Sequence, residues 1–165
     1  KKFKGIKISV INTGLKTMTG GRINRLKTLL KDEIFLLTYG DGLSDVNINK
    51  LIKFHKKNKN IATLTAVRPP ARFGAIKLNG SKVTYFKEKS SLDEGWINGG
   101  FFVLDPKIFN YLKNDKTYLE REPLQKISKK KLLGAYKHNG FWQCLDTERD
   151  KIILEKSINQ KKYKL

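Results

Sequence analysis

Leu36-Leu37-Thr38-Tyr39-Gly40-Asp41-Gly42 is an apolar stretch that ends in an aspartate held between two glycines. The pattern predicts a buried strand with Asp41 at its carboxyl end, where open α/β sheets place their ligands. The two glycines can adopt backbone angles closed to other residues, which lets a ligand approach the main chain. Taken alone, Asp41 is equally well explained as a turn former or a helix cap.

A second stretch, Gly140-Phe141-Trp142-Gln143-Cys144-Leu145-Asp146, also ends an apolar run in a carboxylate. Asp41 and Asp146 are far apart in the sequence, but each is expected at the tip of a strand. A fold that brings the two tips together would let both carboxylates share one divalent cation.

The segments up to Pro70 alternate between strand and helix patterns, which predicts a β-α-β-α-β order and a parallel sheet covered by helices. Apolar residues at three- and four-residue steps mark the helices, and Ser44 or Asp45 is expected to cap the second one. The expected elements are strands over residues 6–11, 34–38 and 61–67, a helix from Gly20 that carries Ile23, Leu26 and Leu30, and a helix that carries Ile48, Leu51, Ile52 and His55.

After Pro70 the pattern changes to a hairpin that turns at Asn79-Gly80, followed by shorter alternating elements. We expect a strand over residues 96–104, helices that begin at Asp105-Pro106 and at Pro123, strands over residues 134–137 and 141–144, and a last helix over residues 147–158. No repeat, linker or composition change divides the chain, so residues 1–165 are predicted to form a single domain.

The chain is strongly basic, with a formal charge of +20 from 35 Lys and Arg against 15 Asp and Glu. Only six of the 35 basic residues are arginine, the residue on which specific recognition of nucleic acids depends most. The lysines are spread along the chain, which favours a solvated surface that attracts small anionic substrates over a nucleic-acid interface. No apolar run is long enough for a membrane span, and the single cysteine, Cys144, predicts a reducing, cytoplasmic setting.

Three further segments could contact a ligand, although each could equally be ordinary surface structure. Residues 17–22, Thr-Met-Thr-Gly-Gly-Arg, lead into a helix whose first N–H groups favour a phosphate; the alternative is a plain helix start. Residues 68–75 carry Arg68 and Arg72 on a proline-stiffened loop. Glu88-Lys89 ends a strand and could hold sugar hydroxyls and a phosphate; the alternative is an exposed ion pair of little energetic value.

Taken in order, these motifs resemble the sugar nucleotidyltransferases, and within them the glucose-1-phosphate cytidylyltransferases. The resemblance runs from about Ile8 to nearly the end of the chain. The motifs that carry it are Thr17-Met18-Thr19-Gly20-Gly21-Arg22, Tyr39-Gly40-Asp41-Gly42, Arg68-Pro69-Pro70 with Arg72-Phe73-Gly74-Ala75, Glu88-Lys89, Trp96-Ile97-Asn98-Gly99-Gly100-Phe101-Phe102 and Gly140-Phe141-Trp142-Gln143-Cys144-Leu145-Asp146-Thr147.

The resemblance implies a Rossmann-like α/β fold with a mixed, mainly parallel sheet flanked by helices. It also implies the reaction of CTP with α-D-glucose 1-phosphate to give CDP-glucose and pyrophosphate, with Mg²⁺ neutralising phosphoryl charge. The residues it implicates are Asp41 and Asp146 as metal ligands, these two with Arg22 as catalytic groups, Thr17, Arg22 and Gly40 in the CTP pocket, and Gly74, Glu88, Lys89 and Asn98 on the glucose 1-phosphate side.

Two features depart from the family pattern. The family begins with a strand and a loop carrying Gly-x-Gly-Thr-Arg, followed by a lysine next to proline, and these 165 residues contain neither. We therefore expect a truncated chain that lacks the first strand and has little or no activity alone, and a homo-oligomer for the full-length protein. Ser90 follows Glu88-Lys89 where the family commonly has proline.

Two alternatives to the enzyme function remain: a non-catalytic module that binds sugar nucleotides and, less favoured, a basic nucleic-acid-binding domain.

Overall fold

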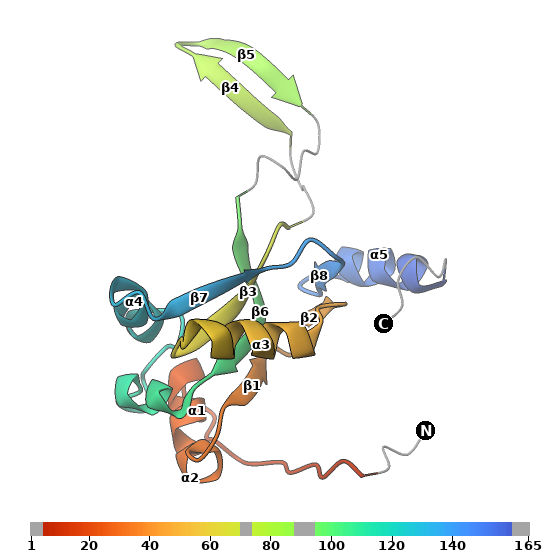
Figure 1. Ribbon diagram of the computed structural model, residues 1–165. Coiled ribbons are helices and arrows are strands. Elements are labelled where there is room, and N and C mark those ends of the chain that lie inside the picture. The colour runs from red at the N-terminus through yellow and green to blue at the C-terminus, as the bar shows by residue number, and fades with distance from the viewer. Residues whose placement is uncertain (1–4, 70–73, 88–94, 160–165) are drawn as a thin grey trace.

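The computed structural model describes residues 5–69, 74–87 and 95–159. A four-stranded sheet, in the order β1 (Phe35–Thr38), β6 (Ile97–Leu104), β3 (Ala62–Val67) and β7 (Leu133–Lys137), forms its centre (Figure 1). β6 runs antiparallel to both of its neighbours, while β3 and β7 are parallel. Three of the four strands thus run in one direction, which confirms the expected mixed, mainly parallel sheet.

The predicted succession of parallel neighbours is wrong at one point, because β6 separates β1 from β3. The physical reason lies in β6 itself, where Phe102, Val103 and Leu104 are at most 1% exposed. A strand this apolar is stabilised most in the middle of the sheet, where helices and loops cover both faces.

Residues 6–11 do not form the predicted strand. Their side chains are largely in solvent, and Ile6, Ile8 and Val10 are 63%, 72% and 97% exposed. In the described part of the chain no strand pairs with this segment. An alternating pattern makes a strand only where a partner and a covered face exist, so the sequence pattern alone was not sufficient here.

The two helices predicted before β3 are present with small differences. The first is split into α1 (Thr19–Arg25) and α2 (Lys27–Leu30), and the second is α3 (Ile48–Asn58). α3 is capped by Asn47, whose side chain accepts a hydrogen bond from the Lys50 N–H at 2.9 Å. The expected caps, Ser44 and Asp45, lie at the end of the short strand β2 (Gly42–Ser44), which the sequence did not reveal.

The core lies on both faces of the sheet. On one face α3 packs against β3, β6 and β7, and its His55 Nδ1 lies 2.9 Å from the hydroxyl of Thr63 on β3. The other face packs against α1, the 3₁₀ helix η1 (Pro106–Tyr111) and α4 (Glu122–Lys129). The residues of this larger cluster are Ile23, Ile61, Ala62, Phe102, Leu104, Ile108, Phe109, Leu112, Leu119, Leu124 and Ile127.

Two smaller β units flank the sheet. The predicted hairpin is present as β4 (Ala75–Asn79) and β5 (Lys82–Lys87), and it projects away from the rest of the molecule (Figure 1). The second unit pairs β2 with β8 (Trp142–Cys144), and the predicted last helix, α5 (Glu148–Asn159), follows it. None of the helices within the described ranges is both long and apolar enough to cross a membrane.

Candidate functional site

The β2–β8 ladder brings the two predicted metal ligands to one end of the same structural unit. Its register pairs Gly42 with Cys144, and beyond the last pair the Leu145 N–H donates to the Asp41 carbonyl at 2.9 Å. Asp41 therefore lies opposite Leu145, the residue before Asp146. Both aspartates are exposed. The backbones of Asp41 and Asp146, which are more than 100 positions apart in the sequence, thus lie at the same end of the ladder.

Hydrogen bonds hold the Asp146 side chain and the segment that follows it. The Cys144 thiol donates to Asp146 Oδ2 at 3.0 Å. On the other side, the Thr147 N–H donates to Asp150 Oδ2 at 3.0 Å, and the Asp150 N–H donates back to Thr147 Oγ1 at 3.2 Å. This reciprocal pair is a capping box that begins α5. It fixes the direction in which the chain leaves the aspartate.

The donor chemistry of this edge fits a hard cation. Mg²⁺ is commonly held by one or two carboxylates together with substrate phosphates and water, rather than by a full set of protein ligands. In the described part of the chain no three His, Cys, Asp or Glu side chains converge, so a site that relied on protein ligands alone is not formed there. Asp41 and Asp146 carry the carboxylate oxygens that such a phosphate-bridged site uses, and they remain the predicted ligands.

A hydrogen-bonded chain of side chains lies next to Asp41. The Tyr39 hydroxyl donates to Glu120 Oε1 at 2.7 Å and accepts from the amide of Asn98 at 3.2 Å. The other oxygen of Glu120 accepts from the hydroxyl of Thr19 at 2.7 Å. Burial, followed by the contact with Glu120, raises the pKa of Tyr39 well above its usual range, so the hydroxyl stays protonated and donates.

Asn98 is oriented by the glycines that follow it in β6. Its side-chain oxygen accepts from the Gly100 N–H at 3.0 Å, and Gly100 has a φ of +78°, which favours glycine. A β-bulge opposite Leu64 and Ala66 accommodates this turn of the strand. The sequence predicted a role for Asn98 but not the part that Tyr39 and Glu120 play in holding it.

Residues 17–22 lie beside the loop that follows η1. The Met18 N–H donates to the Asp115 carbonyl at 2.8 Å, and the Gly21 N–H donates to the Thr117 carbonyl at 3.1 Å. These two donors are therefore not available to a phosphate, contrary to the simplest reading of a free helix start. Arg22 donates to the hydroxyl of Thr13 at 2.7 Å.

The other predicted ligand contacts are distributed unevenly. Thr17 is buried, with 6% of its surface exposed, whereas Arg22 and Gly40 are exposed. Gly74 lies with the hairpin, directly before β4. Two further predicted residues, Glu88 and Lys89, lie outside the described residues, as does Arg72.

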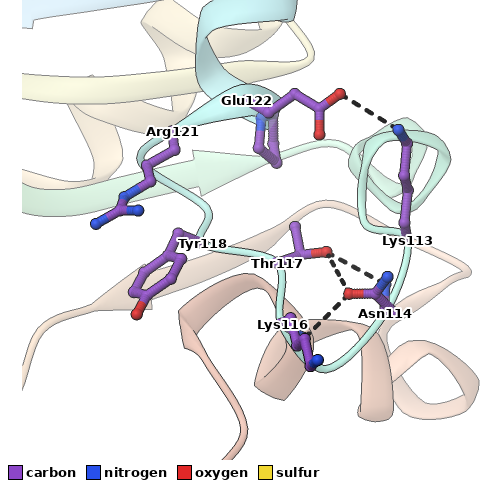
Figure 2. Close-up of a pocket in the computed structure, with 8 residues that line it drawn as sticks. Lys113, Asn114, Lys116, Thr117, Tyr118, Arg121 and Glu122 are labelled. Atoms are coloured by element: carbon purple, nitrogen blue, oxygen red, sulfur yellow. Dashed lines mark hydrogen bonds and ion pairs between the residues drawn. The ribbon is translucent and has the colours of Figure 1, made fainter.

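A pocket of about 430 Å³ lies on the loop that supports residues 17–22 (Figure 2). Lys113 and Glu122 form an ion pair at 3.3 Å across it, and the Arg121 guanidinium lies 4.2 Å from the ring centre of Tyr118. Two smaller pockets are lined by residues of β1, α3, β6 and the start of η1. Asp41 and Asp146 line none of these three pockets.

Comparison with known proteins identifies the fold and the family. The sequence profile of the nucleotidyl transferase family matches residues 3–145. The chain belongs to the nucleotidyl transferase family. A glucose-1-phosphate cytidylyltransferase of Salmonella typhimurium is 46% identical over 156 residues, which are 94% of this chain and 61% of that protein. A protein of Bacillus subtilis named as a probable glucose-1-phosphate cytidylyltransferase is 43% identical over 93% of this chain and 61% of its own length.

The structural comparison agrees with the family assignment. A UDP-glucose pyrophosphorylase solved with UDP-glucose superposes with a TM-score of 0.67 over 93% of this chain and 66% of that chain, at 17% sequence identity. At this identity the likeness concerns the fold alone. The chain spans about three fifths of the length of the cytidylyltransferases that it matches. Its α/β architecture is that of nucleotidyl transferases that act on sugar phosphates.

Proposed function

We propose that this nucleotidyl transferase chain serves the formation of CDP-glucose and pyrophosphate from CTP and glucose 1-phosphate. The observation that supports the proposal is the end of the β2–β8 ladder, where the N–H of Leu145, next to Asp146, donates to the Asp41 carbonyl. The 46% identity to a glucose-1-phosphate cytidylyltransferase favours CTP and glucose 1-phosphate as the substrates.

In this proposal Asp41 and Asp146 hold Mg²⁺ at the phosphates of the nucleotide. When bound, the cation offsets negative charge on phosphoryl oxygens, which favours attack by the sugar phosphate at the α-phosphorus. Arg22 adds a positive charge on the CTP side, with Gly40 leaving room for the ligand beside the backbone. Such chemistry depends on positioning and electrostatics more than on a covalent intermediate.

Residues that lie away from the ladder complete the proposed substrate contacts. Thr17 belongs to the CTP side, and Gly74, Glu88, Lys89 and Asn98 belong to the glucose 1-phosphate side. The same proposal includes a cytoplasmic setting, which the single cysteine favours, and association of subunits in the full-length protein. The formal charge of +20 supports it, because a positive surface raises the local concentration of anionic substrates.

The 165 residues contain no Gly-x-Gly-Thr-Arg loop, so we expect binding of the sugar nucleotide to be retained better than turnover. Calorimetry with CDP-glucose in Mg²⁺ and in EDTA tests binding, and release of pyrophosphate from CTP and glucose 1-phosphate tests turnover. Binding without pyrophosphate release would favour the non-catalytic module. Retention of RNA with a steep salt dependence, and no response to CDP-glucose, would favour a nucleic-acid-binding domain.

Substitution of the two aspartates is the decisive test. We expect Asp41→Asn and Asp146→Asn each to weaken Mg²⁺-dependent binding of CDP-glucose by at least the roughly 10- to 100-fold seen for outer-shell residues of metal sites. Both side chains are exposed, so the unfolding midpoint should stay unchanged. Asp32→Asn is the matched control, because Asp32 is an exposed carboxylate in the turn after α2. Equal affinity in all three variants would overturn the proposed metal site.

A further inference from the structure

We propose that Glu120 is a positioning residue that fixes the loop of residues 17–22 relative to Asp41. The inference deepens the proposed function and rests on it, because these two segments are its nucleotide and metal sides. Sequence patterns give no reason to single out Glu120, which lies in the irregular segment between η1 and α4.

The carboxylate of Glu120 bridges the first residue of α1 and the residue that follows β1. Its Oε2 accepts from the hydroxyl of Thr19, the first residue of α1, and its Oε1 accepts from the hydroxyl of Tyr39, each at 2.7 Å. An ionised carboxylate only accepts, and each of its oxygens meets a hydroxyl donor here. Hydrogen bonds to a charged acceptor are about twice as strong as neutral ones, so this bridge is well suited to hold a distance.

The side of the bridge that carries Thr19 is attached to the rest of residues 17–22. The Leu119 N–H donates to Thr19 Oγ1 at 3.0 Å, next to Glu120. A Cβ added at Gly21 would lie 2.7 Å from the backbone of Asp115, so the start of α1 packs directly on this loop. Arg25 also donates from its Nε to Asp115 at 2.9 Å. Residues 17–25 and the loop of residues 114–120 therefore form one connected unit.

The side of the bridge that carries Tyr39 leads to Asp41, two residues further along the chain. The Tyr39 N–H donates to the Gly100 carbonyl at 3.1 Å, and its ring packs on Phe102 with centroids 5.7 Å apart. Asn98 donates to the same hydroxyl that donates to Glu120. Tyr39 is thus fixed at both its backbone and its ring, so Glu120 ties residues 17–22 to a rigid point beside Asp41.

The pocket shown in Figure 2 offers a matched control next to the loop, at the start of α4. Glu122 lies two residues after Glu120 but contacts Lys113 and Lys126 instead of site residues. Glu122, the first residue of α4, follows this loop directly, so Glu122→Gln removes a nearby carboxylate without touching the bridge. Glu120→Gln keeps the shape of the side chain but replaces one acceptor oxygen by an NH₂ group that faces a hydroxyl.

The test combines hydrogen exchange with ligand binding on the 165-residue chain. In Glu120→Gln we expect faster backbone exchange at residues 17–22 and 39–41 and about 10-fold weaker binding of CDP-glucose with Mg²⁺, with neither change in Glu122→Gln. The exchange measurement needs no ligand. A parent chain that fails to bind CDP-glucose thus refutes the proposed function, while exchange still decides whether Glu120 connects the two segments.

A double-mutant cycle separates positioning from a general loss of structure. Thr19→Ala and Tyr39→Phe should show coupled losses of affinity in the parent chain and additive losses in Glu120→Gln, because the carboxylate transmits the coupling. If Glu120→Gln does not fold, the exchange of residues 17–22 in Tyr39→Phe alone gives the same answer. Unchanged exchange in both segments, or additive effects in the parent chain, would overturn the inference.

Discussion

The four-stranded sheet and the β4–β5 hairpin are built from similar residues but differ in what covers them. β3 is buried along nearly its whole length, while every residue of β5 is exposed. Both contain alternating or continuous apolar residues with a high tendency to form strands. The comparison teaches that local pattern decides whether a strand forms, and long-range packing decides whether it contributes to stability.

The largest difference in the free energy of unfolding should come from replacing one phenylalanine in each region by alanine. Phe102 on β6 is 1% exposed and Phe86 on β5 is 66% exposed. We expect Phe102→Ala to lower the free energy of unfolding by about 3–5 kcal/mol, because it removes contacts and leaves a cavity. Phe86→Ala should change it by no more than about 0.5 kcal/mol. Urea unfolding measures both, and similar losses would show that the hairpin is packed in solution.

The next largest difference in stability should come from replacing one glycine in each region. A Cβ at Gly99 on β6 would lie 2.8 Å from Val67 Cγ1 and 3.1 Å from the Thr65 carbonyl. We expect Gly99→Ala to cost about 1–3 kcal/mol through overpacking. Gly80, in the hairpin turn, has open space and a φ of +58°, so Gly80→Asn should be close to neutral because asparagine tolerates this conformation. Thermal unfolding of both variants checks the difference, and a neutral Gly99→Ala would contradict it.

Replacing threonines by valine should change the free energy of unfolding by less, and the direction of the change should differ between two threonines of β3. The hydroxyl of Thr63 contacts His55 and Asn60, whereas the buried hydroxyl of Thr65 has no hydrogen-bond partner. We expect Thr63→Val to destabilise by about 1–2 kcal/mol and Thr65→Val to stabilise by up to about 1 kcal/mol. Thr84→Val on the hairpin, where the hydroxyl donates at an exposed position, should be nearly neutral. Chemical denaturation of the three variants tests this order, and a destabilised Thr65→Val would refute it.

The smallest expected effect is a pH dependence of the free energy of unfolding that arises from His55, where α3 packs on β3. Burial lowers the pKa of His55 below its ordinary value of 6.5, so the folded chain binds this proton less readily than the unfolded chain. The free energy of unfolding should therefore fall as the pH drops below about 6.5, and it should stop falling once the pH is below the lowered pKa of the folded state. His55→Gln should flatten the part of the profile that lies below about pH 6.5. An unchanged slope would assign it to other groups.

Much of this architecture could be predicted because its signals are local. The strand that ends at Asp41, the hairpin turn at Asn79-Gly80 and the proline at the start of α4 follow from spacing and turn chemistry within a few residues. The insertion of β6 between β1 and β3 depends on pairings across the whole chain, which periodicity does not encode. Residues 6–11 show the converse case, in which a strand-like pattern occurs without a partner strand in the described part.

The candidate site divides in the same way. Asp41 and Asp146 are predicted because each follows an apolar run and each lies in a motif of the family. Glu120 was missed because its contacts reach Tyr39 across 81 positions and Thr19 across 101 positions. A lone glutamate in an irregular loop gives no sequence signal, so only the tertiary structure could show its connections.

One hydrogen bond between β8 and β6 gives this molecule a fluorescent probe of its own. The indole N–H of Trp142 on β8 donates to the Gly99 carbonyl on β6 at 2.8 Å, across the junction between the β2–β8 ladder and the sheet. Indole emission responds to the loss of such a bond and to the entry of water. In a Trp96→Phe background, the fluorescence of Trp142 alone would follow opening and closing of this junction in real time.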